Sequence, residues 1–392
     1  MESAIWAYPW DLLDEGVDTV LGRLADAGIG AVSVAAAYHN VRALCPHNPR
    51  RAVVHGEGGV VYFAPDPAAV SELRIQPVVS EMARERDPLA EICEAAARRG
   101  VRVHAWLVLH HNSRLGGQHP HATVENAFGD RYPFGLCPAN PDVRALTVAL
   151  VRMLAARPEI DSLELESLGY MGLEHTGHHS KTGLEMDDLH RWLLSLCFCP
   201  HCAARMEAQG VEAGAARRRV QGEVRAYFDG RFQQPNDDLH AGLAAVLGQE
   251  WADGILAARD DAVLSLLEEL YWLVRGPQKL CLMVAGSPFA TGAGAGVTLS
   301  LARQWCDRLL CQAFHRDPPV IRAALAEVAV RRGSTPLYAG LQAIPPAARS
   351  ADDLDLAVLA ARDAGVEGIQ FYHYGIMPLR NLDWIRSALA GL

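Results

Sequence analysis

The chain has 392 residues, about 50% of them apolar, and a formal net charge of −10 with its basic residues scattered along the sequence. This acidic balance argues against nucleic acid and anionic membrane surfaces as partners. No apolar run approaches the length of about 18 residues that a membrane span needs, and the first residues lack the pattern of a signal peptide. Nine cysteines in so long a chain do not indicate a disulfide framework. We therefore expect a cytoplasmic protein of enzyme size.

Short apolar strands alternate with helical patterns from the N-terminus onward. A strand at 4–10 is followed by a helical pattern that ends at Gly28, and a second strand at 31–38 by an irregular stretch to about residue 86. The next helix, at 87–100, is opened by Asp-Pro and closed by glycine, as helices commonly are. The remaining predicted strands are 101–111, 161–167, 279–286, 307–314, 335–343 and 366–374, with helices at 141–158, 318–332, 351–364 and 381–391.

Eight strands with helices between them predict a single (β/α)8 barrel, a TIM barrel, over residues 1–392. A doubly wound sheet is the alternative, but no glycine-rich phosphate loop follows the first strand. A mainly helical insertion at 171–276 separates the fourth and fifth strands and must supply the fourth barrel helix. Its other helices could cap the barrel mouth or form the face of a homodimer.

Side chains alternate between the two faces of a strand, so the apolar residues that pack on the outer helices identify the inward ones. In the fourth strand Leu163 and Leu165 face outward, which turns Glu164 and Glu166 into the barrel. Aromatic and neutral polar groups fill the other inward and mouth positions, and such groups suit an uncharged, polyhydroxylated ligand. The expected substrate contacts are Trp6, Tyr8, Trp10, Tyr38, His39, Trp106, His110, His111, Asn112, Tyr170, His175, Gln312, Gln342, Tyr372 and Tyr374.

Three segments carry a resemblance: "VHAWLVLHHNSRLG" at 103–116, "LCPANPDVR" at 136–144 and "LLSLCFCPHC" at 193–202. With the fourth strand, they resemble a group of uncharacterised, glycoside-hydrolase-like (β/α)8 proteins. The resemblance implies a carbohydrate-active barrel with a carboxylate at the end of the fourth strand. The acidic positions of that strand are also weakly similar to the DxxDxDxE strand of chitinase-like barrels, but the position of the final acid holds Leu168.

Glycoside hydrolysis usually needs two carboxyl groups beside the scissile bond. We expect Glu166 to be the general acid/base, because an inward position beside Trp106 would raise its pKa. Glu164 is the second candidate, although it lies one layer deeper. An ion pair with Arg102 or Arg308 would make either carboxylate structural instead. Loop acids are further candidates, namely Glu57, Asp66, Glu125, Asp130, Glu174 and Glu185. A substrate-assisted mechanism would need one protein acid alone.

Two other classes of function stay open. Histidines cluster on the third strand with its loop and on the loop at 175–179, so a metal-dependent hydrolase, lyase or isomerase is the second hypothesis. A carbohydrate-binding barrel without catalysis is the third. The leading hypothesis, a glycosidase acting on a small glycoside or oligosaccharide, requires no cofactor.

A second group of metal ligands lies in the motif "CFCPHC". Cys197, Cys199 and Cys202 fall within six residues, and closely spaced thiolates suit a structural zinc ion. His201 or a neighbouring histidine could supply the fourth ligand, since no second CxxC pair is present. Reduced, packed cysteines are the favoured interpretation of this motif, and a structural zinc ion is the alternative.

Overall fold

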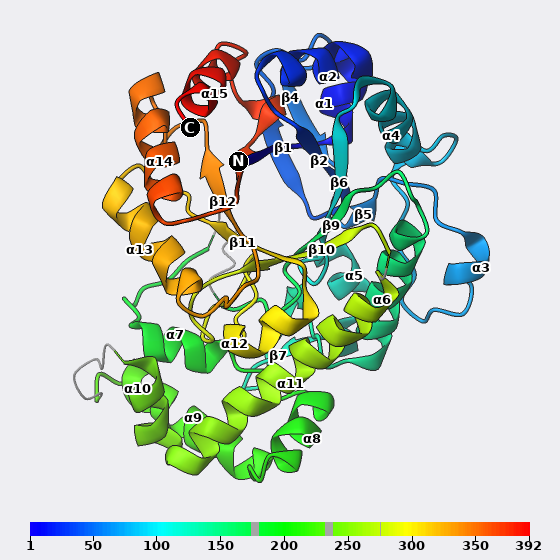
Figure 1. The fold of residues 1–392 in the computed structure, drawn as a ribbon. Coiled ribbons are helices and arrows are strands. Elements are labelled where there is room, and N and C mark those ends of the chain that lie inside the picture. The colour runs from blue at the N-terminus through cyan, green and yellow to red at the C-terminus, as the bar shows by residue number, and fades with distance from the viewer. Residues whose placement is uncertain (174–179, 232–237, 275) are drawn as a thin grey trace.

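The computed structural model describes residues 1–173, 180–231, 238–274 and 276–392, and its centre is a closed barrel of eight parallel strands (Figure 1). The first strand pairs with both the second and the last strand, which closes the barrel. The prediction of a TIM barrel is therefore confirmed. The barrel strands are β1 (Glu2–Ala7), β2 (Ala31–Tyr38), β6 (Arg102–Val108), β9 (Ser162–Glu166), β10 (Lys279–Val284), β11 (Arg308–Gln312), β12 (Leu337–Gln342) and β13 (Gly368–Tyr372).

Helices connect the strands and cover the outside of the barrel (Figure 1). The unit between β10 and β11 holds only α12 (Leu299–Ala302) and the 3-10 helix η3 (Arg303–Trp305). The other barrel helices are α1 (Pro9–Glu15), α2 (Val17–Asp26), α4 (Pro88–Arg99), α6 (Pro141–Ala155), α13 (Pro318–Ala329), α14 (Ala351–Asp363) and α15 (Asn381–Ala390). Asp87 caps the start of α4 and Gly100 ends it in the left-handed region, as the sequence predicts.

Most predicted strands are too long at their carboxyl ends. The first was expected at 4–10, but β1 ends at Ala7 and α1 begins at Pro9. Proline is favoured at the first position of a helix, where its missing N–H is not needed. Trp10 therefore belongs to a helix and not to a strand, and its ring stacks on that of Tyr8.

The loops at the carboxyl ends of the strands contain short strands and short helices. The loop after β2 forms a hairpin and a short strand that pairs antiparallel with β2, and the loop after β6 forms another hairpin. These elements are β3 (Val41–Leu44), β4 (Val53–Gly56), β5 (Val60–Val61), α3 (Pro67–Val70), η1 (Glu81–Ala83), α5 (Ser113–Gln118), η2 (Pro120–Ala122), β7 (Thr123–Glu125), β8 (Arg131–Leu136) and η4 (Tyr374–Ile376).

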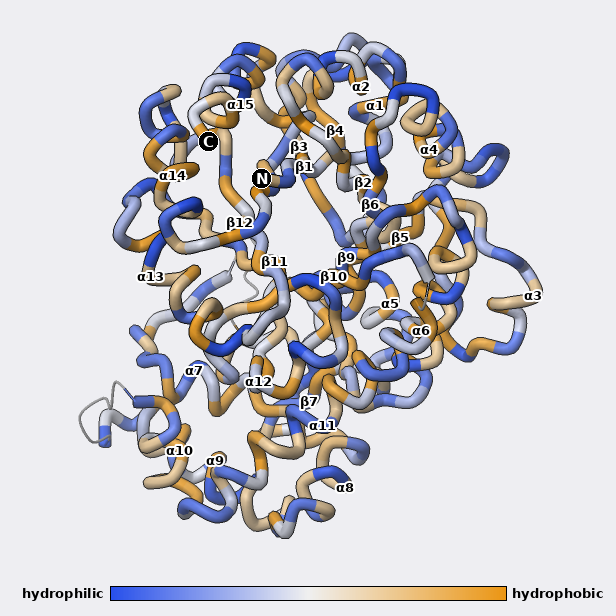
Figure 2. Tube along the Cα trace, viewed as in Figure 1, coloured by the Kyte–Doolittle hydropathy of each residue, from blue (hydrophilic) through white to orange (hydrophobic). Residues whose placement is uncertain are grey.

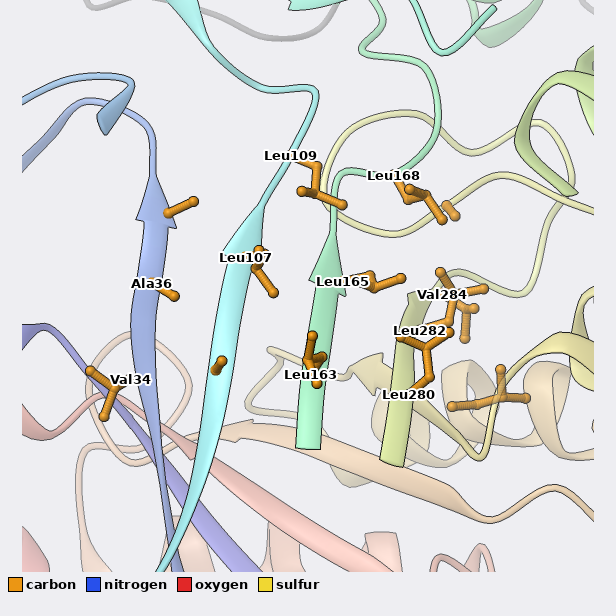
Figure 3. Packing of buried hydrophobic residues seen from close by; sticks show 14 of the residues in the cluster. Val34, Ala36, Leu107, Leu109, Leu163, Leu165, Leu168, Leu280, Leu282 and Val284 are labelled. Atoms are coloured by element: carbon orange, nitrogen blue, oxygen red, sulfur yellow. The ribbon is translucent and has the colours of Figure 1, made fainter. Parts of the chain in front are cut away.

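The outward face of the strands is apolar and packs on the helices. Leu107, Leu163, Leu165 and Leu282 project to the same side of neighbouring strands (Figure 3) and belong to the largest buried apolar cluster. A separate cluster fills the barrel interior, and it is rich in aromatic rings. This division confirms the predicted alternation in β9, with leucines outside and glutamates inside.

The insertion between β9 and β10 has an apolar core of its own. Its helices are α7 (Asp188–Ser195), α8 (Pro200–Ala208), α9 (Ala213–Phe228), α10 (Leu239–Leu247) and α11 (Gln249–Leu273). Apolar and polar residues alternate along α11 (Figure 2), whose first half packs in the insertion and whose second half packs on the barrel. The second half of α11 is thus the expected fourth barrel helix. None of the helices described has the length and apolar character of a membrane span.

Candidate active site

Glu166 is the last residue of β9 and faces the barrel interior beside β6. The indole N–H of Trp106 donates a hydrogen bond of 2.6 Å to one carboxylate oxygen of Glu166. Only 7% of the residue is exposed. Burial, together with the charge of Glu164, raises the pKa of Glu166 to about 7 against the lowering effect of the Trp106 hydrogen bond. A carboxyl group with this pKa can donate or accept a proton near neutral pH.

Glu164 lies deeper in the barrel, and both of its carboxylate oxygens have hydrogen-bond partners. One of its oxygens bonds the ring of His104 at 2.8 Å, and the other accepts hydrogen bonds from Ser33 at 2.5 Å and Gln370 at 2.9 Å. Burial opposes its ionisation, but the hydrogen bonds and the charge of His104 outweigh burial and lower the pKa of Glu164. This arrangement favours the structural alternative for Glu164, a buried anion on β9 that binds side chains from three other strands.

The partner of Glu164 is a histidine, where the sequence suggested an arginine. His104 also lies 3.5 Å from Asp161, and its two acidic neighbours, Asp161 and Glu164, raise the pKa of His104 against the lowering effect of burial. Arg102 and Arg308 approach Asp161 at 4.0 and 3.9 Å. His104 therefore lies between Glu164 and a charged group at the amino ends of the strands, which consists of Asp161, Arg102 and Arg308.

Aromatic rings fill the space below the mouth. Trp6 lies across Trp106 and Tyr372 with ring centroids 6.0 and 5.8 Å apart, and the phenol of Tyr8 donates a hydrogen bond of 3.1 Å to that of Tyr38. All but Tyr372 are almost fully buried. The interior of a TIM barrel is packed with side chains, so these four rings form the floor of the site and support it.

The residues with accessible surface at the mouth are fewer than expected. Gln312, Gln342 and Tyr372 end three neighbouring strands and are each partly exposed, and Phe314 lies beside Tyr372 with ring centroids 5.4 Å apart. Phe314 lies within the predicted strand at 307–314, on the same face as Gln312, but the prediction named Gln312 alone. His39, just after β2, is also partly exposed.

Two expected contacts point away from the mouth. His110 bonds Thr147 of α6 at 3.2 Å, and burial lowers its pKa to about 4. Consecutive backbone N–H groups of Leu109 and His110 donate to the chain of β9, which interrupts the alternation of the strand. Tyr374 lies in η4, where its hydroxyl contacts Arg23 at 3.1 Å. Both predictions are corrected, because the strands end before these residues.

The remaining expected contacts have varied surroundings. Trp10 stacks on Tyr8 with ring centroids 4.4 Å apart, and Asn112 accepts a hydrogen bond from the backbone of Leu115 as the cap of α5. Tyr170 lies against the cysteines described below and not at the mouth. The ring of His111 stacks on that of His39 at 4.0 Å. His175 lies outside the described residues.

Asp11 is a buried carboxylate that sequence reasoning did not single out. It accepts a hydrogen bond of 2.8 Å from the backbone N–H of Tyr8, and one oxygen lies 3.8 Å from the ring of His373. Burial is the main cause that raises the pKa of Asp11 to about 7. Asp11 stands at the start of the predicted helical pattern, but that pattern did not indicate that its carboxylate bonds the backbone of Tyr8. Asp11 fixes the turn that presents Tyr8 to the barrel.

The loop acids have structural partners where they are described. Glu125 forms ion pairs with Arg131 and Arg217, Asp66 caps α3, Asp130 accepts a bond from Asn126, and Glu57 accepts bonds from Ser80 and the backbone of Glu81. Glu185 is exposed and Glu174 lies outside the described residues. Among the residues described, Glu164 is the one carboxylate whose charge acts on Glu166.

The three cysteines of "CFCPHC" come together with a fourth, Cys137, which follows β8. All four thiol sulfurs are buried and lie within 4.8 Å of one another, with Cys137 3.5 Å from Cys202 and 3.6 Å from Cys199. Four cysteine sulfurs in a tight group fit the donor set of a structural zinc ion. The structure offers Cys137 as a fourth ligand, in the place for which the sequence suggested a histidine. Cys137 could have been found from its own motif, "LCPANPDVR", but its distance in sequence concealed it.

The fold resembles those of solved glycosidase structures. A β-galactosidase from the haloarchaeon Halorubrum lacusprofundi matches with a TM-score of 0.58 at 12% identity, over 99% of this chain and 57% of that one. A β-galactosidase from Marinomonas ef1 matches with 0.59 at 11% identity over 99% and 59%, and an α-L-fucosidase from Paenibacillus thiaminolyticus with 0.56 at 11% identity over 96% and 46%. The chain thus spans about half the length of these structures. No protein-family model and no curated protein matches the chain. At these identities the likeness concerns the fold, a TIM barrel shared with glycosidases.

Proposed function

We propose that this protein is a glycosidase that cleaves a small glycoside or oligosaccharide, with Glu166 as general acid/base. The observation that carries the proposal is the buried carboxyl group at the end of β9 with a pKa of about 7. Catalytic residues of TIM barrels lie at the carboxyl ends of strands. Protonated Glu166 donates its proton to the oxygen that leaves as the glycosidic bond breaks, and the Trp106 N–H stabilises the resulting carboxylate. Water supplies the hydroxyl that replaces this oxygen on the sugar carbon, and the proton released from the water returns to Glu166.

The partly exposed groups at the carboxyl ends of β11, β12 and β13 support a sugar as the substrate. Tyr372 and Phe314 offer ring surfaces, while the amides of Gln312 and Gln342 can donate and accept hydrogen bonds with hydroxyls. None of these four carries a charge, so they favour a neutral ligand. The fold that this chain shares with a β-galactosidase and an α-L-fucosidase points the same way.

The test is hydrolysis of a panel of aryl glycosides that includes an aryl β-galactoside and an aryl α-L-fucoside. Removing a general acid typically costs about 100- to 10,000-fold in rate. We expect Glu166→Gln to lose kcat/KM by that factor, and Glu72→Gln, an exposed control, to keep it. A Glu166→Gln enzyme that retains wild-type activity would overturn the assignment.

Two other outcomes would favour the alternative functions. Stabilisation of the fold by saccharides without turnover would indicate a carbohydrate-binding barrel. Activity that a chelator abolishes and a metal restores, with Glu166→Gln still active, would indicate a metal-dependent enzyme. Among the described residues, the four clustered cysteines are the one group that could hold a metal ion.

We also propose that Cys137, Cys197, Cys199 and Cys202 hold a structural zinc ion. Such an ion would join the loop after β6 to the start of α8, because Cys137 comes from the first and Cys202 from the second. Four protein ligands close the coordination sphere, so the ion supplies stability and no chemistry. The expected result is one zinc per chain by elemental analysis of protein purified without chelators, and a metal-free protein would refute this part.

A further inference from the structure

Arg259 is a buried cation that forms no ion pair with any residue in the described part of the chain. It lies within α11, is 5% exposed, and its Nε and Nη1 have no hydrogen-bond partner among the described residues. Its neighbour Asp260 accepts a hydrogen bond of 2.9 Å from the backbone of Thr298 at the start of α12. An unpaired buried charge is strongly unfavourable. An anion beside Arg259 would remove that cost.

The groups that face Arg259 are rings and cysteines. Its guanidinium lies 4.4 Å from the ring centroid of Tyr170 and 5.3 Å from that of Trp192. Arg259 also lines one small cavity with Tyr170, Cys197 and Cys202. The hydroxyl of Tyr170 lies 3.3 Å from the sulfur of Cys202. Tyr170 therefore touches the cation on its face and the cysteine cluster on its edge.

We infer that Arg259 is the buried counter-charge of a doubly negative metal–thiolate centre at Cys137, Cys197, Cys199 and Cys202. This inference rests on the proposed zinc site. Four thiolates around one Zn²⁺ leave two negative charges, and neutral thiols would leave no anion among the described side chains that line the cavity of Arg259. The positive charge of Arg259 stabilises the thiolate form that binds metal, while Tyr170 and Trp192 hold the guanidinium in place. Arg259 is thus a positioning residue for the centre and not a ligand.

The experiment measures zinc content and the rate at which zinc passes to a chromophoric chelator. Residues outside the ligand shell typically change metal affinity by about 10- to 100-fold. We expect Arg259→Met to release zinc faster than the wild type by about that factor. Arg259→Lys, which keeps the charge, should stay within about threefold of the wild type. Arg218→Met is the matched control, because Arg218 lies in the same insertion with 70% of its side chain exposed.

The outcomes separate the two proposals. Wild-type protein without zinc refutes the zinc site and with it the role of Arg259. Wild-type protein with zinc, and equal release rates in Arg259→Met, refutes the role of Arg259 alone. If Arg259→Met does not fold, Arg259→Lys decides: release as slow as in the wild type supports the charge, and release more than tenfold faster overturns it.

A double substitution distinguishes charge from packing. Cys137→His replaces one thiolate by a neutral ligand and leaves one negative charge on the centre. The effect of Arg259→Met is the factor by which it speeds zinc release, measured once in the wild-type protein and once in the Cys137→His protein. If Arg259 acts through charge, this factor is smaller in the Cys137→His protein. An equal factor in both backgrounds would show that Arg259 acts only by packing on Tyr170 and Trp192.

Discussion

The indole nitrogen of Trp106 lies 2.6 Å from a carboxylate oxygen of Glu166, where β6 and β9 end side by side. This hydrogen bond favours the charged form of Glu166, whereas burial and the charge of Glu164 favour the neutral form. The balance leaves the pKa of Glu166 at about 7. The contributions of Trp106 and of Glu164 can each be removed by one substitution, and the two substitutions should shift the pKa of Glu166 in opposite directions.

Replacing Trp106 with phenylalanine should raise the pKa of Glu166, because the lowering hydrogen bond is lost. For a general acid the active form is protonated, so activity falls as pH rises through its pKa. We therefore expect the basic limb of the kcat/KM profile to move to higher pH in Trp106→Phe. A hydrogen bond to a charged group is worth about 1.5–3 kcal/mol, which sets the expected loss of stability above neutral pH. An unmoved limb would contradict this role of Trp106.

Glu164→Gln should move the same limb in the opposite direction. Glu164 raises the pKa of Glu166 through its charge, and the amide keeps the shape of the side chain without that charge. The basic limb is expected at lower pH than in the wild type. Because His104 loses its ionised partner, we also expect a destabilisation of about 3 kcal/mol in urea unfolding. A limb that moves to higher pH would refute the electrostatic link between the two glutamates.

Glu166→Gln should change how stability depends on pH. The folded protein keeps the Glu166 proton up to about pH 7, whereas the unfolded chain releases it near its usual value of 4.5. The free energy of unfolding of the wild type therefore falls as pH rises through this window, and the glutamine variant lacks that fall. The variant should gain about 3 kcal/mol relative to the wild type between these pH values. Parallel stability profiles of the two proteins would show that Glu166 titrates normally.

Gly340 gives Trp6 the room to lie across the barrel floor. A Cβ atom at Gly340 would lie 3.0 Å from the indole of Trp6. Gly340→Val should displace this ring, destabilise the protein by about 1–3 kcal/mol and raise KM more than it lowers kcat. Gly183→Val is the control, since nothing lies within 4 Å of a Cβ atom there. Wild-type kinetics in Gly340→Val would show that the floor does not shape the site.

Cys137→Ser should remove the zinc and lower the melting temperature. Structural zinc contributes directly to folding energy, and Cys137 is the ligand that comes from outside the "CFCPHC" segment. Chelator treatment of the wild type should reproduce the loss, and added zinc should reverse it. Cys311→Ser, which changes another buried cysteine outside the group, should keep its zinc and respond to the chelator as the wild type does. A similar fall of the melting temperature in both variants would show that the cysteines stabilise the protein by packing and not by binding a metal ion.

Strand alternation predicted the direction of several side chains that the structure confirms. Glu164, Glu166, Trp6 and Trp106 all face the interior, because alternation follows from backbone geometry within one strand. The method failed beyond strand ends, as the position of His110 against α6 shows. There the chain turns, and its direction depends on what it packs against.

The sequence by itself determined the barrel, the number of its strands and the inward direction of Glu166, since these follow from local periodicity and chain order. Only the tertiary structure decided that Glu164 is bound by Ser33, His104 and Gln370 from three other strands, and that Cys137 meets Cys199 and Cys202. Such contacts join residues far apart in the chain. They depend on barrel closure and on loop paths, which no local pattern encodes.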